Sequence, residues 1–541
     1  MTVLVNLLTL PVTAAREVID QSLAFGPWKC LATATVMWVS ALWVHHHHRR
    51  TRRGLPPGPL GIPYFGNLFQ LSTQPEVQLT QWAKKYGGLY SLKLGARDVM
   101  ILTHPKIVKD LCVTRGNIYS SRMDWYIMGD VLLENRGVGA TPYNDKWRLH
   151  RKVANSSLSL RALNNFNPIV DAEGTVFVHS LLHEGALGQT PVNPLLHCAR
   201  FPMNSMLSII FGWRTSGADD PLIRRAMAMG EDFSVITGMT QNAVDFLPLL
   251  KLFPLENVKR ARKLKQEFFD CWGGMLKDLE VRIDDGEEIK DCLAKGLIEL
   301  YKQKEMDWTD IVMFCTGIML AGIETTAGSI AWLLSILSHH PEIQRKAQAE
   351  LDAVVGRDRM PTLADMNDLQ YIRAMLKEVL RFRNPFPQGI PHFTTEDDTY
   401  EGFHIPAKSV VMINVHGLHF DEERYPNADQ FQPERFLHDR TNFTESANCA
   451  DPMQRDQWSF GAGRRICAGM HLAEREMYLA ISRALWAFDI VGLEGEMSDL
   501  DKFEGELPRS PVAFRVKFVP RDAKVAGIID LAHAGSSAEA A

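Results

Sequence analysis

The chain has 541 residues, 46% hydrophobic and 23% charged, a balance typical of a globular protein whose length permits one large domain or two to three smaller ones. The formal net charge of −5 argues against nucleic acid as the main partner. The 8 cysteines are scattered without a Cys-x-x-Cys pair, which favours free thiols in a reducing compartment over a disulfide framework.

The first 63 residues predict a membrane anchor followed by a hinge. After a lead segment at 1–30, residues 31–44 are uncharged and apolar, and a block of histidine and arginine follows them. Such a block stays on the cytoplasmic side, so we expect a single transmembrane segment at 31–44. The stretch is shorter than the roughly 20 residues that span a bilayer, which leaves an interfacial helix or an unrelated leader as the alternative. Residues 45–63 end in closely spaced prolines, which predict a stiff hinge.

Residues 64–520 predict one large domain that is mainly helical with smaller β sheets. Residues 89–103 alternate around a central turn and predict a hairpin, and helical patterns dominate from about 104 to 350. Three further elements are expected: short strands at 399–415, a helix at 472–486 and a last hairpin at 506–518. The tail at 521–541 is rich in alanine, glycine and serine, which predicts disorder.

Trp147 and Arg151 are four residues apart in a helical segment, so their side chains share one face. Arginine can bind a carboxylate through two parallel hydrogen bonds, and tryptophan can donate one from its indole. The pair therefore suits an anionic group, although such a pattern by itself is more often surface packing.

A long apolar helix is predicted over residues 310–338, starting at Asp307 or Thr309. Four residues recur on one face of this helix: Phe314, Ile318, Ala321 and Thr325. The three apolar members of this face carry no charge, which weakly favours a lipophilic ligand beside the helix.

Gly322 interrupts the long helix at a cost of about 1 kcal/mol relative to alanine. The missing side chain makes room for a small ligand, and the adjacent Glu324 and Thr325 unite an acid with an alcohol, as proton delivery requires. The alternative is a packing glycine next to a threonine whose hydroxyl bonds the backbone four residues earlier.

Glu378 and Arg381 are three residues apart on a predicted helix and face the same way. Such a pair is usually a solvated salt bridge worth less than about 1 kcal/mol. Arg435, within Gln-Pro-Glu-Arg-Phe, offers a third partner.

The strongest signal is the segment 458–469, Trp-Ser-Phe-Gly-Ala-Gly-Arg-Arg-Ile-Cys-Ala-Gly. Glycines let the backbone pass close to a flat ligand, and a phosphate loop would end in Lys-Ser or Lys-Thr. Cys467 stands beside cationic side chains and ahead of a helix, so we expect a lowered thiol pKa and a thiolate able to ligate haem iron. A structural cysteine in a tight turn is the alternative. A zinc half-site with His471 has no second Cys/His pair nearby in the sequence.

With its Phe-x-x-Gly-x-Arg-x-Cys-x-Gly spacing, this segment resembles the cysteine-ligand loop of the cytochrome P450 family. The resemblance covers about residues 55–520, with four motifs in the family's order. It implies the P450 fold, one haem b whose iron is bound by Cys467, and roles in oxygen activation for Glu324 and Thr325.

The resemblance assigns three further sets of residues. Haem contacts are expected from Trp147, Arg151, His392, Phe460, Arg465 and Gly469. A buried network for folding and haem loading is expected from Glu378, Arg381 and Arg435. Substrate-lining positions are expected at Trp125, Phe314, Ile318, Ala321, Phe386 and Ile390.

The resemblance also implies a monooxygenase that inserts one oxygen atom of O2 into a lipophilic small molecule. The chain has no flavin or nicotinamide fingerprint, so electrons are expected from NADPH through a separate cytochrome P450 reductase, with cytochrome b5 as a further candidate partner. The expected place is the endoplasmic reticulum membrane, with the catalytic domain in the cytosol. The sequence around Cys467 is similar to filamentous-fungal members acting on terpenoids or polyketides in secondary metabolism. A reductase-independent isomerase or peroxygenase and a non-catalytic haem sensor remain as alternatives.

Overall fold

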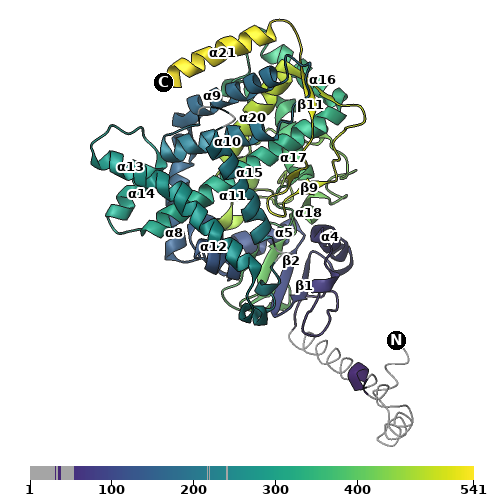
Figure 1. Cartoon of the computed structure of the whole chain (residues 1–541). Helices are drawn as coiled ribbons and strands as arrows, with labels where there is room; N and C mark the ends of the chain where they lie inside the picture. Colours follow the sequence, from purple (N-terminus) through teal and green to yellow (C-terminus); the bar gives the residue numbers. More distant parts are fainter. Residues whose placement is uncertain are drawn as a thin grey trace, which may run out of the picture.

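The computed structural model describes residues 31, 34–37, 54–215, 217, 220–238 and 242–540. The predicted lead segment, anchor and basic block therefore lie largely outside the described residues. In Figure 1 the sheet strands β1 and β2 lie at one end of the helix-rich body, and helices α9 and α21 lie at the opposite end. The hinge prolines run along β1, because the Ser91 amide donates to Pro57 O (2.8 Å) and the Ser91 hydroxyl to Pro56 O (2.7 Å).

The main sheet has five strands in the order β1-β2-β7-β4-β3. Their bounds are β1 (Leu89–Leu94), β2 (Arg97–Leu102), β3 (Ser121–Arg122), β4 (His392–Phe393) and β7 (Val410–Ile413). The predicted hairpin is confirmed as the antiparallel β1–β2 pair, and only β2–β7 is parallel among these pairs. All four residues of β7 are buried because its alternate side chains enter two different apolar clusters, one on each face.

Three two-stranded sheets complete the β structure: β5 (Asp398–Tyr400) with β6 (Phe403–Ile405), β8 (Phe488–Gly492) with β11 (Val516–Pro520), and β9 (Phe503–Glu504) with β10 (Ser510–Pro511). The expected strands in 399–415 are confirmed. The expected hairpin at 506–518 is wrong in its pairing, because Phe518 pairs with Ile490 of β8, and both side chains are buried in the core.

Helices form most of the remaining structure. The longer ones besides α15 and α20 are α4 (Pro75–Tyr86), α8 (Asp145–Ser157), α9 (Leu160–Glu184), α10 (Leu195–Phe211), α11 (Pro221–Thr237), α12 (Glu256–Phe268), α13 (Gly274–Asp284), α14 (Leu293–Lys302), α16 (Pro341–Val354), α17 (Gln370–Phe382) and α21 (Val525–Ala540). The short ones are α5 (Pro105–Val108), α6 (Gly116–Tyr119), α7 (Gly137–Ala140), α18 (Val415–His419) and α19 (Phe443–Ala447).

Short 3-10 or π helices link these elements: η1 (Leu68–Gln70), η2 (Lys109–Thr114), η3 (Tyr126–Leu133), η4 (Ala243–Asp245), η5 (Pro248–Leu252), η6 (Phe269–Gly273), η7 (Leu363–Asp365), η8 (Pro433–Phe436) and η9 (Gly463–Arg465). The region 116–141 contains the short helices α6, η3 and α7.

The predicted long helix is α15 (Trp308–His339), which runs through the core. It begins at Asp307, whose side chain and that of Asp310 form a capping box. Among the described residues, α15 is the one helix long and apolar enough to cross a membrane, but 61% of its most apolar window is buried inside the protein. It therefore serves as the central core helix of the domain.

Helix α20 (Met470–Ala487) follows the cysteine segment directly and packs against α9, α15 and α17. The disordered tail predicted at 521–541 is wrong, because α21 occupies most of it. Val525 and Ile529, one turn apart, are fully buried and anchor α21 against α9. Alanine-rich sequence has high helix propensity, so a few apolar contacts are enough to order it.

Candidate functional site

Cys467 is held by a tight backbone structure. Its amide donates to Phe460 O (2.9 Å), and the Gly469 amide donates to Cys467 Sγ (3.3 Å). Gly463 has φ +63°, and a Cβ there would lie 2.1 Å from Cys112 O of η2, so only glycine fits at this position. The segment thus fixes a sulfur atom on rigid backbone between η9 and α20.

The predicted lowering of the Cys467 pKa is wrong in direction. Burial raises the pKa of the thiol, although the Gly469 amide and the charge of Arg151 both act to lower it. The residue surface of Cys467 is nevertheless accessible, while its neighbours Arg465 and Met470 are buried. A sulfur in this setting becomes a thiolate when a metal cation binds it, because coordination deprotonates a thiol.

Helix α15 also has accessible surface inside the core. Ala321 is exposed and Thr325 is half-buried, although Met319 and Ile330 on the same helix are fully buried. The Thr325 hydroxyl donates to Ala321 O at 2.7 Å, as the back-bonding alternative predicts. The sequence attributes Gly322 to space for a ligand; in the structure a Cβ there would lie 2.8 Å from the Met206 side chain of α10, so close packing of the two helices also favours this glycine.

Glu324 points away from Thr325 toward α11. A Cβ on Gly230 would overlap its carboxylate, so the acid lies directly against α11. Burial, and then the charge of Glu231, raises the pKa of Glu324 to about 7. Among the hydrogen bonds of the described residues none joins Glu324 to Thr325. The acid and the alcohol are thus adjacent in sequence but are not bonded to each other among the described residues.

Arg465 and Trp147, predicted as haem contacts, lie in direct contact. The Arg465 guanidinium carbon lies 4.3 Å from the Trp147 ring centroid, and both side chains donate to Val138 O. Arg465 also donates to Ser120 O and Thr141 O, each at 2.7 Å. Arg465 therefore connects the cysteine segment to the region of β3 and α7.

Arg122 was missed by sequence reasoning. It lies opposite His392 in the β3–β4 register, is buried, and donates to Ile390 O (2.6 Å) and Pro391 O (3.0 Å). His392 itself bonds Tyr119 O through Nδ1 at 2.7 Å. No local pattern marks Arg122, because its role depends on pairing with a strand about 270 residues away.

Arg122, Arg151, Arg465 and His392 form a group, three cationic guanidinium groups and one imidazole, that we call the basic cluster. Burial, and then repulsion from Arg122 and Arg151, lowers the pKa of Arg465 to about 8. Burial likewise lowers the pKa of Arg122 to about 10 and that of His392 well below its usual range. None of the four forms an ion pair with any carboxylate that the structure describes.

Buried cations without counter-charge are costly, so the basic cluster suits an anionic ligand such as a pair of carboxylates.

The comparisons with known proteins identify the family. The family model for cytochrome P450 matches residues 56–518. The chain belongs to the cytochrome P450 family.

Curated relatives of this P450 are fungal. It is 33% identical over 510 residues to cytochrome P450 monooxygenase virE of Hypocrea virens, covering 92% of this chain and 90% of the relative. It is 36% identical over 483 residues to cytochrome P450 monooxygenase fsoB of Humicola fuscoatra, covering 86% and 87%. It is 32% identical over 504 residues to cytochrome P450 monooxygenase fogE of Aspergillus ruber, covering 91% of each.

Haem is the cofactor of the P450 family, and the residues present fit it. Cys467 offers one sulfur ligand that coordination to a metal cation would deprotonate, and the basic cluster offers the charge that two propionates require. Phe460 and Gly469, both predicted haem contacts, bond the cysteine itself and so shape its immediate surroundings.

The predicted network of Glu378, Arg381 and Arg435 is present and buried. Arg381 donates to both carboxylate oxygens of Glu378 at 2.7 and 2.8 Å, and both side chains have no exposed surface. Arg435 reaches Glu378 Oε1 at 3.3 Å. Arg381 also donates to His419 O, Ala428 O and Gln430 O, so it ties α17 to the segment that leads to η8.

The predicted substrate-lining residues separate into two groups. Ala321, Phe386 and Ile390 have accessible surface and Ile318 is 9% exposed. Phe314 is fully buried beside the His150 ring, and Trp125 is packed in the apolar cluster on one face of the main sheet. The latter two therefore lie behind the accessible surface in this structure.

Proposed function

We propose that this P450 is a haem-thiolate monooxygenase that inserts one oxygen atom of O2 into a lipophilic small molecule, as part of fungal secondary-metabolite biosynthesis on a terpenoid or polyketide skeleton. The observation that carries the proposal is the accessible Cys467 sulfur together with a buried basic cluster that has no described carboxylate partner. A structural cysteine would need neither the accessible sulfur nor the unpaired cations.

Bound haem supplies the activation of dioxygen, and the residues of the chain bind, orient and move protons around it. Cys467 is the iron ligand, and the basic cluster with Trp147 binds the propionates. Glu324, with a pKa of about 7, exchanges protons near neutral pH. The Thr325 hydroxyl lies beside the exposed Ala321 on α15, where it would pass a proton to a ligand bound against this helix.

The electron donor proposed is NADPH, through a separate membrane-bound cytochrome P450 reductase, with cytochrome b5 as an auxiliary partner. Arg464 is exposed beside the cysteine segment, and its guanidinium carbon lies 5.4 Å from the Tyr143 ring centroid. Arg148 lies over the same ring at 5.0 Å. Arg148 is paired with Asp145, so Arg464, three residues before Cys467, is the cation that would contact an acidic flavoprotein surface.

Exposed apolar side chains support attachment to the endoplasmic reticulum membrane, with a single anchor at 31–44. On η5 and just after it, Leu252 is 80% exposed and Phe253 62%. Phe69 of η1 is 71% exposed. Both segments adjoin the β1–β2 turn, because Phe65 O accepts from the Gly95 amide and Phe246 O from the Ala96 amide. A patch of this kind suits insertion into the membrane surface beside the anchor.

The proposal is tested by reconstituting the full-length protein with a fungal reductase in vesicles and screening lipophilic substrates for a Soret shift. Reduced, carbon-monoxide-treated protein should show the spectrum of a thiolate-ligated haem, and oxygenated product should form only with NADPH and reductase. Thr325→Ala should retain the spectrum and lose product relative to NADPH consumed. Product from peroxide alone would favour the isomerase or peroxygenase alternative, and a Thr325→Ala variant without effect would favour the sensor.

A further inference from the structure

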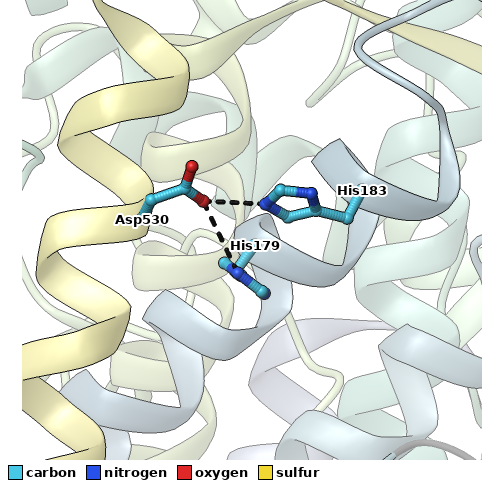
Figure 2. A group of neighbouring side chains, drawn as sticks. All are labelled: His179, His183 and Asp530. Atoms are coloured by element: carbon cyan, nitrogen blue, oxygen red, sulfur yellow. Dashed lines mark hydrogen bonds and ion pairs between the residues drawn. The ribbon is translucent and has the colours of Figure 1, made fainter.

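Helix α21 brings an acid and a histidine against two histidines of α9. His179 and His183 are one turn apart on α9, and Asp530 lies across from them on α21 (Figure 2). His183 Nε2 lies 2.7 Å from Asp530 Oδ1, and His179 Nε2 lies 3.5 Å from the same oxygen. The ligand atoms of all three side chains lie within 4.8 Å of one another.

We propose that His179, His183 and Asp530 form a binding site for a divalent transition-metal cation of the zinc class, which fastens the C-terminal helix to α9. Two imidazoles and one carboxylate are ligands that Zn²⁺ accepts, with further positions left to water. Zinc bonds of about 2.0–2.2 Å place tetrahedral ligands about 3.4 Å apart. The His179–Asp530 separation of 3.5 Å is near that spacing, whereas His183 and Asp530, 2.7 Å apart, would separate slightly to admit the ion.

Apolar packing, independent of any metal, holds the two helices in place. Val525 and Ile529 on α21 are fully buried, and Leu181 and Leu182 between the two histidines of α9 are fully buried as well. The three ligand side chains lie at the edge of this contact, with His179 25% exposed and His183 and Asp530 about half exposed. A cation can therefore reach them from solvent.

The charges around the three residues are compatible with a cation. The His533 ring stacks on His179 with centroids 3.9 Å apart, so an imidazole rather than a cationic side chain covers this ligand. Arg200 and Arg214 lie near His533, but both are paired with Glu173.

The proposed site lies partly outside the region shared with the family. The family match ends at residue 518, so Asp530 and all of α21 come after it. None of the three ligands belongs to the basic cluster or to the cysteine segment. The site thus depends on a helix outside the matched segment, and its proposed function is to stabilise that helix rather than to take part in the oxidation.

The test is zinc titration of the full-length, haem-loaded protein by isothermal calorimetry after chelator treatment. The run His45–His48 would itself bind zinc, so all variants carry serine at those four positions. We expect one bound zinc, and a loss of affinity greater than about tenfold in both His183→Ala and Asp530→Asn, since even an outer-shell partner of a metal is worth about 10–100-fold. His438→Ala, which removes an exposed histidine elsewhere, should bind as the parent does.

A second measurement separates this site from adventitious binding. Lys524 and Arg521 precede α21, and zinc should slow tryptic release of the C-terminal segment in the parent but not in Asp530→Asn. The Soret spectrum of each variant reports whether the haem domain is intact. Absence of zinc binding, or binding that persists in both ligand variants, would overturn the proposal. Zinc binding without proteolytic protection would overturn the fastening role.

Discussion

Glu476 on α20 gives the sharpest prediction about stability. Its carboxyl group is 1% exposed, lies against the hydroxyls of Ser205 on α10 and Thr326 on α15, and its Oε1 has no hydrogen-bond partner among the described residues. Burial raises the pKa of Glu476 from an ordinary 4.5 to about 8, although both hydroxyls act to lower it. The folded protein therefore holds this acid in its neutral form at neutral pH.

The sign of the pH dependence follows from that shift. An acid whose pKa is raised by folding leaves the fold fully stable below the ordinary pKa of 4.5, and stability is lost as pH rises toward about 8. Each tenfold change in proton concentration corresponds to about 1.4 kcal/mol, so the loss between about pH 5.5 and about pH 8.5 is about 3 kcal/mol. With an unfolding entropy of roughly 2.1 cal/mol/K per residue, this corresponds to about 3 °C for a chain of this length.

The perturbation is Glu476→Gln, which keeps the shape and the hydrogen-bonding oxygen but cannot ionise. We expect the Tm difference between variant and parent to increase by about 3 °C in favour of the variant from about pH 5.5 to about pH 8.5. Thermal unfolding is monitored by circular dichroism and Soret absorbance at one scan rate. Glu474→Gln on the same helix is the graded control, because burial raises the pKa of Glu474 only to about 7, so its gain should be smaller. A difference between variant and parent that stays flat across this pH range would refute the reasoning.

Three further predictions concern the haem region. Arg381→Ala should cost about 3–5 kcal/mol and abolish haem retention, because the buried Glu378 carboxylate loses its two short bonds and keeps only the longer contact with Arg435. Arg435→Ala should cost less, and both effects are measured as Soret absorbance per protein after purification. Gly230→Ala should displace the Glu324 carboxylate and lower product formed per NADPH consumed, with folding unchanged by circular dichroism. Arg122→Ala should speed haem transfer to apomyoglobin by about tenfold or more, while equal transfer rates would remove Arg122 from the basic cluster.

Local sequence patterns were sufficient to predict the elements whose structure is determined by neighbouring residues of one segment. The β1–β2 hairpin follows from alternation around Gly95. Helix α15 begins at Asp307 because Asp307 and Asp310, three residues apart, form a capping box. The glycine spacing around Cys467 is likewise local, and the structure explains Gly463 by the close approach of Cys112 O.

Properties that arise between distant segments could not be predicted in this way. Arg122 joins the basic cluster only through the β3–β4 register, and Gly322 lies where the Met206 side chain of another helix packs closely. The pKa of Cys467 was predicted with the wrong sign because the sequence displays the neighbouring cations but not the burial that outweighs them. Helix α21 was missed because composition alone does not reveal that Val525 and Ile529 meet a buried surface.

One kind of ligand would offset both unfavourable electrostatic features of the site, the buried thiol and the buried basic cluster. Burial disfavours the charged form of Cys467 and of Arg465, and it leaves the basic cluster without a described counter-charge. A ligand that carries a metal cation at its centre and two carboxylates at its edge would offset both costs at once, because the cation stabilises the thiolate and the carboxylates stabilise the guanidinium groups. Binding energy of this kind becomes folding energy when the unfolded chain cannot bind the ligand. The same residues that would position haem for chemistry therefore make the stability of the core depend on its presence.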